Sequence, residues 1–200
     1  MGLVMRRTKE DANETLRKLI GVAKKHFTEH GYAGAALEAI AADAEVTRGA
    51  LYHHFRNKHG LFLSVLESVQ QEVGERVEQE ASRSDDLREQ LLLGCRAFLT
   101  AAVEPENKRI MLIDGPSVLG WDTWRMLDEK NSMSHLREQL TLMQEQGMFE
   151  AASVEALAAF ISGGLNESAL RMAELPDTAA AMEQTMKLMS HLVSAWDQRL

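Results

Sequence analysis

The sequence is poor in residues that cross-link or interrupt a fold. Among its 200 residues it holds one cysteine, Cys95, and three prolines. A lone cysteine excludes an intrachain disulfide and makes the reducing cytoplasm the expected location. No window approaches the run of about 18 uncharged apolar residues that a membrane helix needs. Residues 1–7 carry no apolar core of a signal peptide, so secretion is not expected either.

Patterns that form β-strands are also scarce. β-branched residues are sparse, and no stretch alternates apolar and polar residues over several positions. Ala, Leu, Glu, Gln and Met, which are good helix formers, dominate instead. Hydrophobic residues make up 45% of the chain and charged residues 26%, which excludes disorder as the main state and allows a buried core. We expect an all-α fold in one domain or two small ones.

The net charge is negative but unevenly distributed. A formal charge of −8 counts at first against a nucleic-acid partner, because DNA-binding proteins place positive charge against phosphate. Residues 1–60, however, hold 10 Lys and Arg against 7 Asp and Glu, a charge of +3. Residues 61–200 hold 12 against 23, a charge of −11. Five of the seven histidines also lie in the first 60 residues, so we expect a basic head on an acidic body.

Apolar residues at helical spacing predict about nine helices, three of them in the head. The expected ranges are about 11–30, 37–44, 47–54, 57–80, 85–103, 122–147, 153–175 and 177–196, with a short apolar piece inside a broken region at 104–120. Gly31 is expected to stop the first helix, and Pro176 to stop the helix before it, with Asp177 capping the last one.

Two short predicted helices with a tight turn between them have the layout of a helix-turn-helix motif, whose second helix enters the major groove of DNA. Thr47 suits the N-cap of that second helix, because its hydroxyl can accept a bond from a backbone N–H. Arg48 can read guanine or clamp phosphate, and Gly49 permits close approach to DNA. Lys58 opens the next helix, where backbone N–H groups and a cation can hold a phosphate together.

Residues 31–62 resemble the DNA-binding domain of the TetR family of bacterial transcriptional regulators. The family pattern is a small polar residue, any residue, glycine, any residue, and then Leu-Tyr-x-x-Phe-x-x-Lys. The matching residues are Thr47, Gly49, Leu51, Tyr52, Phe55 and Lys58. The likeness covers about 50 residues, and the remaining 140 or so fit the family's helical body in length and layout only.

The resemblance implies a DNA-binding domain at residues 1–57 and a helical ligand-binding and dimerisation domain at residues 58–200. The implied DNA contacts are Thr47, Arg48, Gly49, Tyr52, His53, His54 and Lys58. Tyr52 and Lys58 would mainly hold phosphate, and Arg48 and His53 would read bases. A structural role as a partly buried aromatic residue remains the alternative for Tyr52.

Two positions depart from the family's usual pattern. Members often carry Thr or Ser just before the first short helix, where this chain has Ala35 and Ala36, so we expect that helix to lack a side-chain cap. Members often have glycine in the turn between the two helices, where this chain has Glu45. A left-handed backbone at Glu45 would be strained.

Large apolar residues around the broken central region are candidates for a ligand pocket, because helical bodies place pockets between helices. The candidate ligand-binding residues are Phe98, Met111, Asp114, Trp121, Trp124, Met126, Met143 and Asn166, with Arg171 as a further polar partner. The alternative for each apolar residue is ordinary core packing.

The last two predicted helices carry apolar residues suited to a two-fold four-helix interface. The candidate dimer residues are Val154, Leu157, Ile161, Leu165, Met182, Met186, Met189, Val193 and Trp196. Residues 159 and 162–164 are small enough to allow close helix approach. Packing within one chain is the alternative.

Other chemistry is expected to be absent. His26, Glu29 and His30 match the H-x-x-E-H pattern of one zinc-protease class, but no third ligand lies on a matching helix. Cys95, among apolar neighbours, is expected to be a core residue rather than a redox sensor. We therefore expect no metal, no cofactor and no enzymatic activity.

The expected function is a homodimeric transcriptional regulator, most simply a repressor, that a small-molecule effector releases from a double-stranded DNA operator. The alternative is a small architectural or nucleoid-associated DNA-binding protein without a ligand. The long acidic body argues against that alternative, because a general DNA binder would carry basic surface throughout.

Overall fold

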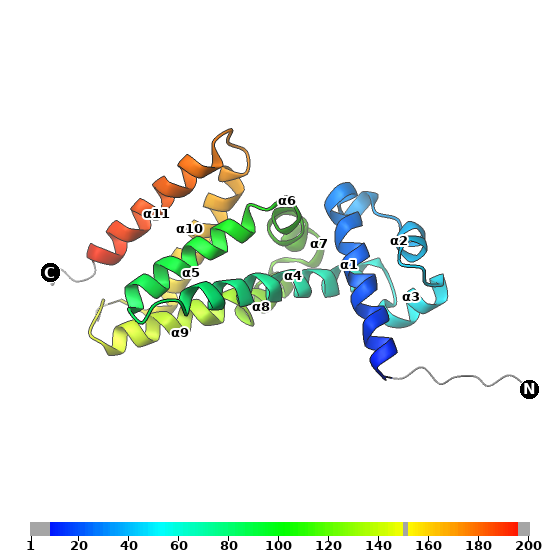
Figure 1. The fold of residues 1–200 in the computed structure, drawn as a ribbon, viewed down its shortest axis with the longest axis horizontal. Helices are drawn as coiled ribbons and strands as arrows, with labels where there is room; N and C mark the ends of the chain where they lie inside the picture. Colours follow the sequence, from blue (N-terminus) through cyan, green and yellow to red (C-terminus); the bar gives the residue numbers. More distant parts are fainter. Residues whose placement is uncertain (1–8, 150–151, 196–200) are drawn as a thin grey trace, which may run out of the picture. The chain divides into compact units, whose positions relative to one another are not determined.

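The computed structural model of the protein describes residues 9–149 and 152–195, which form helices and no strand. The elements are α1 (Lys9–Gly34), α2 (Leu37–Asp43), α3 (Arg48–Phe55), α4 (Lys58–Ala81), α5 (Leu87–Ala102), α6 (Pro105–Asn107), the π-helix η1 (Lys108–Asp114), α7 (Gly115–Leu119), α8 (Trp121–Glu129), α9 (Ser132–Glu145), α10 (Val154–Met172) and α11 (Thr178–Ala195) (Figure 1). The expected all-α fold is confirmed. None of the described helices is both long and apolar enough to span a bilayer.

The helix starts follow from capping side chains. Thr47, Asp86 and Ser153 each precede a helix, and each accepts a hydrogen bond from a backbone N–H in its first turn. Asp177 does the same for α11, where the amide of Ala180 donates to its carboxylate at 2.9 Å. These bonds satisfy N–H groups that have no partner inside the helix, which stabilises the ends that the sequence predicts.

Among the described residues, two regions are divided into helices differently from the prediction. The single helix expected at 122–147 is two helices, α8 and α9, which meet at Asn131. The backbone of Asn131 leaves the helical region (φ −123°, ψ −114°), and its side-chain amide nitrogen donates to the carbonyl of Leu127 at 2.8 Å. No proline or glycine marks this break, so the periodicity gave no stop signal.

The region at 104–120 is helical rather than broken. Pro105 occupies the first turn of α6, where the missing proline N–H has no helical partner to lose. Pro116 lies in the first turn of α7, directly after the π-helix η1. The helix end predicted at Gly31 is a kink instead. The first helical segment continues to Gly34, but Gly31 inside it has a non-helical backbone (φ 67°), so a kink stands where a stop was expected.

Within α4 the chain divides into two compact units, one ending at Ser68 and the other beginning at Val69. The first unit, here called the head, packs α1, α2, α3 and the start of α4 around fully buried side chains. Phe27 of α1 and Phe62 of α4 meet edge to face, with ring centroids 5.1 Å apart. The fully buried residues of the head are Leu19, Ala23, Phe27, Ile40, Leu51, Leu61, Phe62, Val65 and Leu66.

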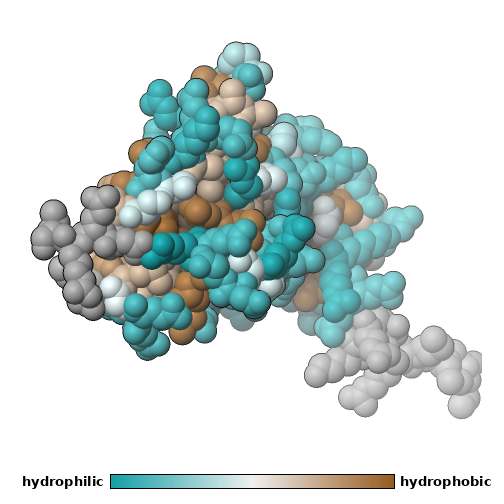
Figure 2. All heavy atoms as spheres, turned by 60° about the vertical axis from the view of Figure 1, so that its left-hand side comes forward, coloured by the Kyte–Doolittle hydropathy of each residue, from teal (hydrophilic) through white to brown (hydrophobic). Residues whose placement is uncertain are grey.

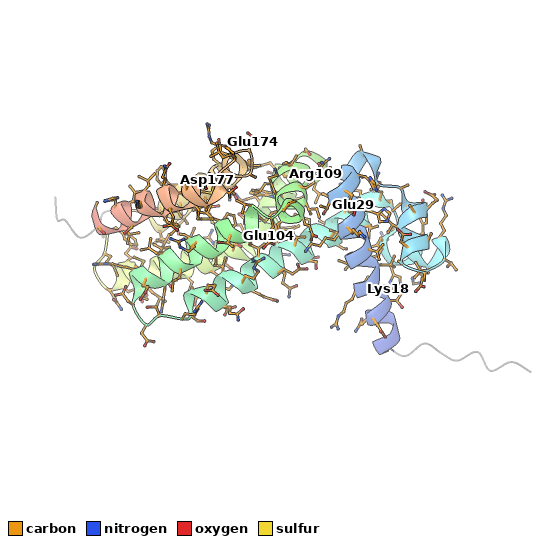
Figure 3. All side chains as sticks on the ribbon, turned by 45° about the horizontal axis from the view of Figure 1, so that its top comes forward. Lys18, Glu29, Glu104, Arg109, Glu174 and Asp177 are labelled. Carbon is orange, nitrogen blue, oxygen red and sulfur yellow. The ribbon has the colours of Figure 1, made fainter. Side chains whose placement is uncertain are left out.

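The second unit, here called the body, is built around α5, which contacts α9, α10 and α11 (Figure 1). Ion pairs join several of its helices. Arg76 of α4 makes a two-pronged pair with Glu104, between α5 and α6, at 3.0 and 2.8 Å; Glu104 is labelled in Figure 3. Arg96 of α5 reaches Glu183 of α11 at 2.6 Å. Each arginine pairs across two elements that packing already brings together.

Candidate nucleic-acid interface and ligand cavity

The turn between α2 and α3 closes through backbone bonds. The amides of Ala44 and Val46 donate to the carbonyls of Ile40 and Ala41, both at 3.0 Å. Glu45 between them takes a left-handed backbone (φ 56°), which is strained for a residue with a side chain. Lys18 of α1, labelled in Figure 3, pairs with the Glu45 carboxylate. That hydrogen bond and the attraction of the ammonium lower the pKa of Glu45.

The two short helices are capped unequally, as the sequence predicts. The Thr47 hydroxyl accepts from the amide of Ala50 at 3.1 Å and so starts α3. Ala36 precedes α2 and offers no side-chain cap. Of the two helices, α3, which is expected to enter the major groove, therefore has the better-defined N-terminus.

One face of α3 is buried and the rest is exposed. Leu51 and Phe55 anchor the helix inward, at 0% and 6% exposure. Thr47, Arg48, Gly49, His53 and His54 are exposed, while Tyr52 and Lys58 are half-buried. The structure thus brings all seven predicted DNA contacts onto α3 and the ends that flank it. Their contact with DNA stays a prediction.

Arg48 lies on a small network at the exposed face of α3. Its guanidinium donates to the Tyr52 hydroxyl at 3.4 Å, one helical turn on, and its Cζ lies 5.3 Å from the centre of the Tyr52 ring. Its Nη1 also lies 3.2 Å from a carboxylate oxygen of Glu38 on α2. The bond to Tyr52, and then the negative charge of Glu38, raise the pKa of Arg48. Sequence reasoning did not identify Glu38.

Lys58 is held at the junction of α1 and α4. Its ammonium donates to the carbonyl of Ala33 at 3.0 Å and lies 4.9 Å from the centre of the Tyr32 ring. Asn57 caps α4, since its side chain accepts from the amide of Gly60 at 2.8 Å. The first amides of α4 and this cation therefore lie at the same end of the head.

The H-x-x-E-H residues of α1 make other contacts. His26 Nε2 lies 2.7 Å from a carboxylate oxygen of Asp43 on α2, and His30 Nε2 lies 3.8 Å from Glu29. In the part of the chain that the structure describes, no three His, Cys, Asp or Glu side chains gather in a group that could hold a metal. His26 instead joins α1 to α2.

The body contains a cavity of about 290 Å³ between α4, α5, α8, α9 and α10. Of the predicted ligand-binding residues, only Phe98 lines it. Cys95 is buried as predicted, but it also lines the cavity, and burial raises the pKa of its thiol to about 12. Leu165, predicted for the dimer, is a lining residue too. The other lining side chains carried no pattern beyond ordinary helical amphipathicity.

The remaining predicted ligand residues lie elsewhere in the body. Met111, Trp124 and Met143 are buried, and the Trp124 indole donates to the Met111 carbonyl at 2.7 Å, which joins α8 to η1. Trp121 and Met126 are half exposed or more. Asp114 pairs with Arg109 at 3.4 Å. Asn166 is half-buried, and Arg171 lies exposed, 4.0 Å from Glu167.

Most of the predicted dimer residues are already covered within one chain. The buried ones are Val154, Ile161, Leu165, Met186, Met189 and Val193, and the half-buried ones are Leu157 and Met182. Trp196 lies outside the described residues. The same helices expose other apolar side chains that the periodicity did not single out, namely Phe160 of α10 at 69% and Leu188 of α11 at 60%. Figure 2 shows hydrophobic residues, in brown, exposed on the surface of the body.

Comparison with known protein families finds two matches. Residues 19–65 match bacterial regulatory proteins of the tetR family, and residues 88–196 match a tetracyclin repressor-like C-terminal domain. The first match covers the helix-turn-helix, and the second covers more than half of the chain.

Individual proteins agree with these matches. The HTH-type transcriptional regulator AcrR of Shigella flexneri is 35% identical over 112 residues, 54% of this chain and 50% of AcrR. The probable acrEF/envCD operon repressor of Escherichia coli K12 is 38% identical over 96 residues, 44% of this chain and 43% of that protein. The chain thus spans about half the length of the curated relatives it matches, or less. The crystal structure of a TetR-family transcriptional regulator from Pectobacterium atrosepticum is 35% identical, with a TM-score of 0.76 over 95% of this chain and 97% of that one.

Proposed function

The chain belongs to the TetR family of bacterial transcriptional regulators, and we propose that it is a repressor that binds an operator through its head and leaves it when a small molecule occupies its body. The observation that carries the proposal is the capped helix α3, anchored by Leu51 and Phe55, with its polar residues exposed along the other faces. A helix of this kind can enter a major groove while its buried face stays on the head. Such a regulator works in the cytoplasm, where bacterial DNA lies.

We assign the seven head residues to two roles. Arg48 and His53 read base edges, because both side chains are exposed on α3 and can donate hydrogen bonds to acceptors in the groove. Thr47, Tyr52, His54 and Lys58 hold phosphate, with the amides at the start of α4 as additional donors. Gly49 allows close approach of DNA, because it carries no side chain at this exposed position of α3; a Cβ there would lie 3.9 Å from the Thr47 hydroxyl oxygen.

The domain division that we propose follows these roles. Residues 1–57 form the DNA-binding domain and residues 58–200 the effector-binding and dimerisation domain, with Lys58 at the boundary contacting phosphate. The long helix α4 begins at Lys58 and continues into the cavity wall, where Val77 and Glu78 are lining residues. Effector binding can change DNA affinity only if the effector has different affinities for the DNA-bound and free states.

The homodimer uses the exposed faces of α10 and α11 in this proposal. Phe160 and Leu188 are large apolar residues left open by the fold of one chain. Gly163 and Gly164 stand on the same side of α10 as Phe160, one turn on, and are open to solvent. A two-fold axis would pair these helices with their copies, and the glycines would let the backbones come close.

The test of DNA binding starts with selection of duplexes from a random pool. We expect the protein to enrich one inverted repeat and to bind it at least 1,000 times more tightly than random duplex at moderate salt. Arg48→Ala should lose roughly tenfold to 100-fold in affinity for the selected duplex. The matched control is Arg83→Ala, an exposed arginine in the body, which should bind as the parent does.

Equal affinity for selected and random duplexes would instead identify an architectural DNA-binding protein. Unchanged affinity in Arg48→Ala would remove Arg48 from the base-reading set.

A further inference from the structure

The body cavity is shaped for a small ligand. Its volume of about 290 Å³ is near twice the cavity of about 150 Å³ that holds one benzene. A molecule of about two fused rings therefore fills it. Apart from Asp128, the buried side chains of the lining are apolar, namely Leu91, Cys95, Phe98, Met133 and Leu165.

The ionisable side chains at the cavity are acidic. Glu78 of α4 and Glu138 of α9 are exposed lining residues, so they stand on its open side. Asp128 of α8 is a third carboxylate of the lining and is 7% exposed. Among the described residues that line the cavity, none is Lys or Arg, and His135 is the single histidine. An anionic ligand would thus meet two exposed carboxylates and no permanent cation.

The negative charge of Asp128 is partly compensated by an arginine outside the cavity. Arg125, which is not a lining residue, lies 3.1 Å from its carboxylate and stacks over Trp121 and Trp124. Burial raises the pKa of Asp128, and Arg125 opposes that rise. Glu78 and Glu138 are exposed and have no Lys or Arg beside them among the described lining residues, so they add negative charge to the cavity.

The amide side chains of the lining reinforce this polarity. The amide nitrogen of Gln90 donates to the carbonyl of Ser84, and that of Gln139 donates to the carbonyl of Leu87, both at 2.8 Å. Both glutamines therefore donate a side-chain N–H to a backbone carbonyl of the protein. The polar lining is then richer in acceptors than in donors, which suits a ligand that brings its own N–H groups.

We propose that this cavity binds a compact organic cation, a protonated amine carried on an apolar group of about two rings. Its apolar part lies against Phe98 and Met133, and its ammonium lies towards Glu78 and Glu138. This inference rests on the proposed function, in which the body senses a small molecule, and it names the class of that molecule. Charge-assisted bonds to carboxylates favour an amine over a neutral ligand of the same shape.

Three probes with one skeleton test the charge preference. These are 2-naphthylmethylammonium, 2-naphthylmethanol and 2-naphthoate, titrated into the full chain by calorimetry at pH 7. We expect the cation to bind at least tenfold more tightly than the alcohol, and the carboxylate to bind most weakly. The cation's affinity should fall with added salt, while that of the alcohol should stay nearly constant. Tightest binding of the alcohol or the carboxylate, or no binding of the cation, overturns the proposal.

The charge variant is Glu78→Gln with Glu138→Gln. Both residues are exposed, so the double change should preserve the fold and lower the affinity for the cation roughly fivefold or more, leaving the alcohol unaffected. The matched control is Glu75→Gln with Glu145→Gln, which removes the same charge from exposed positions of α4 and α9 outside the lining. Equal loss of cation affinity in both double variants would show a general field effect and overturn the assignment.

Cys95 reports where the probe binds. It is the one cysteine of the sequence, it lines the cavity, and its raised pKa of about 12 makes its alkylation slow. Saturating cation should slow alkylation of Cys95 at least tenfold at pH 8.5. If the cation binds without protecting Cys95 from alkylation, it binds outside the cavity, and the proposed site is wrong.

The same preparation separates this inference from the proposed function. Binding to the selected duplex is measured first, without any probe. Normal duplex binding with a preference for the alcohol leaves the regulator in place and overturns only the cationic class. Failure to bind any duplex selectively overturns the proposed function, whatever the probes do.

Discussion

At the scale of single residues, Gly60 fixes how α3 meets α4. A Cβ at Gly60 would lie 2.2 Å from the backbone oxygen of Phe55, well inside any tolerated contact. The chain turns sharply here, since Arg56 has a positive φ of 62° and Asn57 caps the new helix through the Gly60 amide. Only a residue without a side chain allows Phe55 to remain buried while α4 starts so close to it.

Gly60→Ala should therefore destabilise the head. The expected loss in the free energy of unfolding is roughly 1–3 kcal/mol, because the backbone of Phe55 must move to relieve the clash. Gly21→Ala is the control, since Gly21 lies in α1 with open space around its Cβ position and should gain up to about 1 kcal/mol. Urea unfolding monitored by circular dichroism measures both. Equal stability of Gly60→Ala and the parent would contradict the close approach.

Glu38 is a second residue with an effect beyond its own position. It lies beside Arg48 on the exposed face of the head, so phosphate and Glu38 compete for the same guanidinium. A bidentate contact with guanine can replace the Glu38 pair, whereas a loose encounter with random DNA replaces it less well. Glu38 thus opposes non-specific binding more than specific binding.

Glu38→Gln should raise affinity for random duplex about two- to fivefold and raise affinity for the selected duplex less, so that the ratio between them falls. Glu67→Gln removes the same charge from an exposed site on α4 and serves as the control. Fluorescence anisotropy with both duplexes at one salt concentration gives the ratio. An unchanged ratio in Glu38→Gln would exclude the competition.

At the scale of elements, α10 and α11 each have two faces with different roles. Their inner faces are buried on the body through residues such as Ile161 and Met189. Their outer faces expose Phe160 and Leu188. Contact of these apolar side chains with water costs free energy, which a second subunit would remove by covering them. The hydrophobic periodicity of a helix cannot distinguish these faces when both carry apolar residues.

Phe160→Glu combined with Leu188→Glu should dissociate the proposed dimer. A two-fold interface contains each change twice, so the dissociation constant should rise at least 100-fold. Met126→Glu, at a half-exposed apolar site on α8, is the control and should leave the dimer intact. Sedimentation velocity across a concentration series reads the result. A double variant that stays dimeric would move the interface to another surface.

At the scale of the whole molecule, charge is divided between two tasks. The first 60 residues carry +3 and the remainder carries −11. Binding of the head to phosphate releases counterions and depends on salt, whereas the acidic body gains nothing from lying along DNA.

Lys58→Ala tests this division through salt dependence. The plot of log affinity against log salt concentration should lose about one unit of slope for each head, because one phosphate contact disappears. Lys130→Ala removes an exposed lysine from the body and should leave the slope unchanged. Filter binding or anisotropy between 50 and 200 mM salt, the range over which such slopes are resolved, gives both values. Equal slopes in all three proteins would show that Lys58 stays on the Ala33 carbonyl in the complex.

The head followed from the sequence further than the body did. Thr47 as a cap and Ala36 as a missing cap are local features, and local geometry decides them. The break at Asn131 had no such marker, so α8 and α9 were expected as one helix. The cavity was harder still, since its walls come from five helices and only Phe98 among its residues had been singled out.

By itself, the sequence determined the helical class, the helix-turn-helix, the charge division and the family, because each of these is a local pattern or a sum over residues. Only the tertiary structure decided which apolar side chains are core, which line the cavity and which stay exposed. Cys95, Leu165 and Phe160 look alike in a helical pattern, yet one lines the cavity from α5, one lines it from α10 and one faces outward. The physical reason is that helical spacing sets the angle of a side chain about its helix axis, while burial depends on the neighbours that folding brings to that angle.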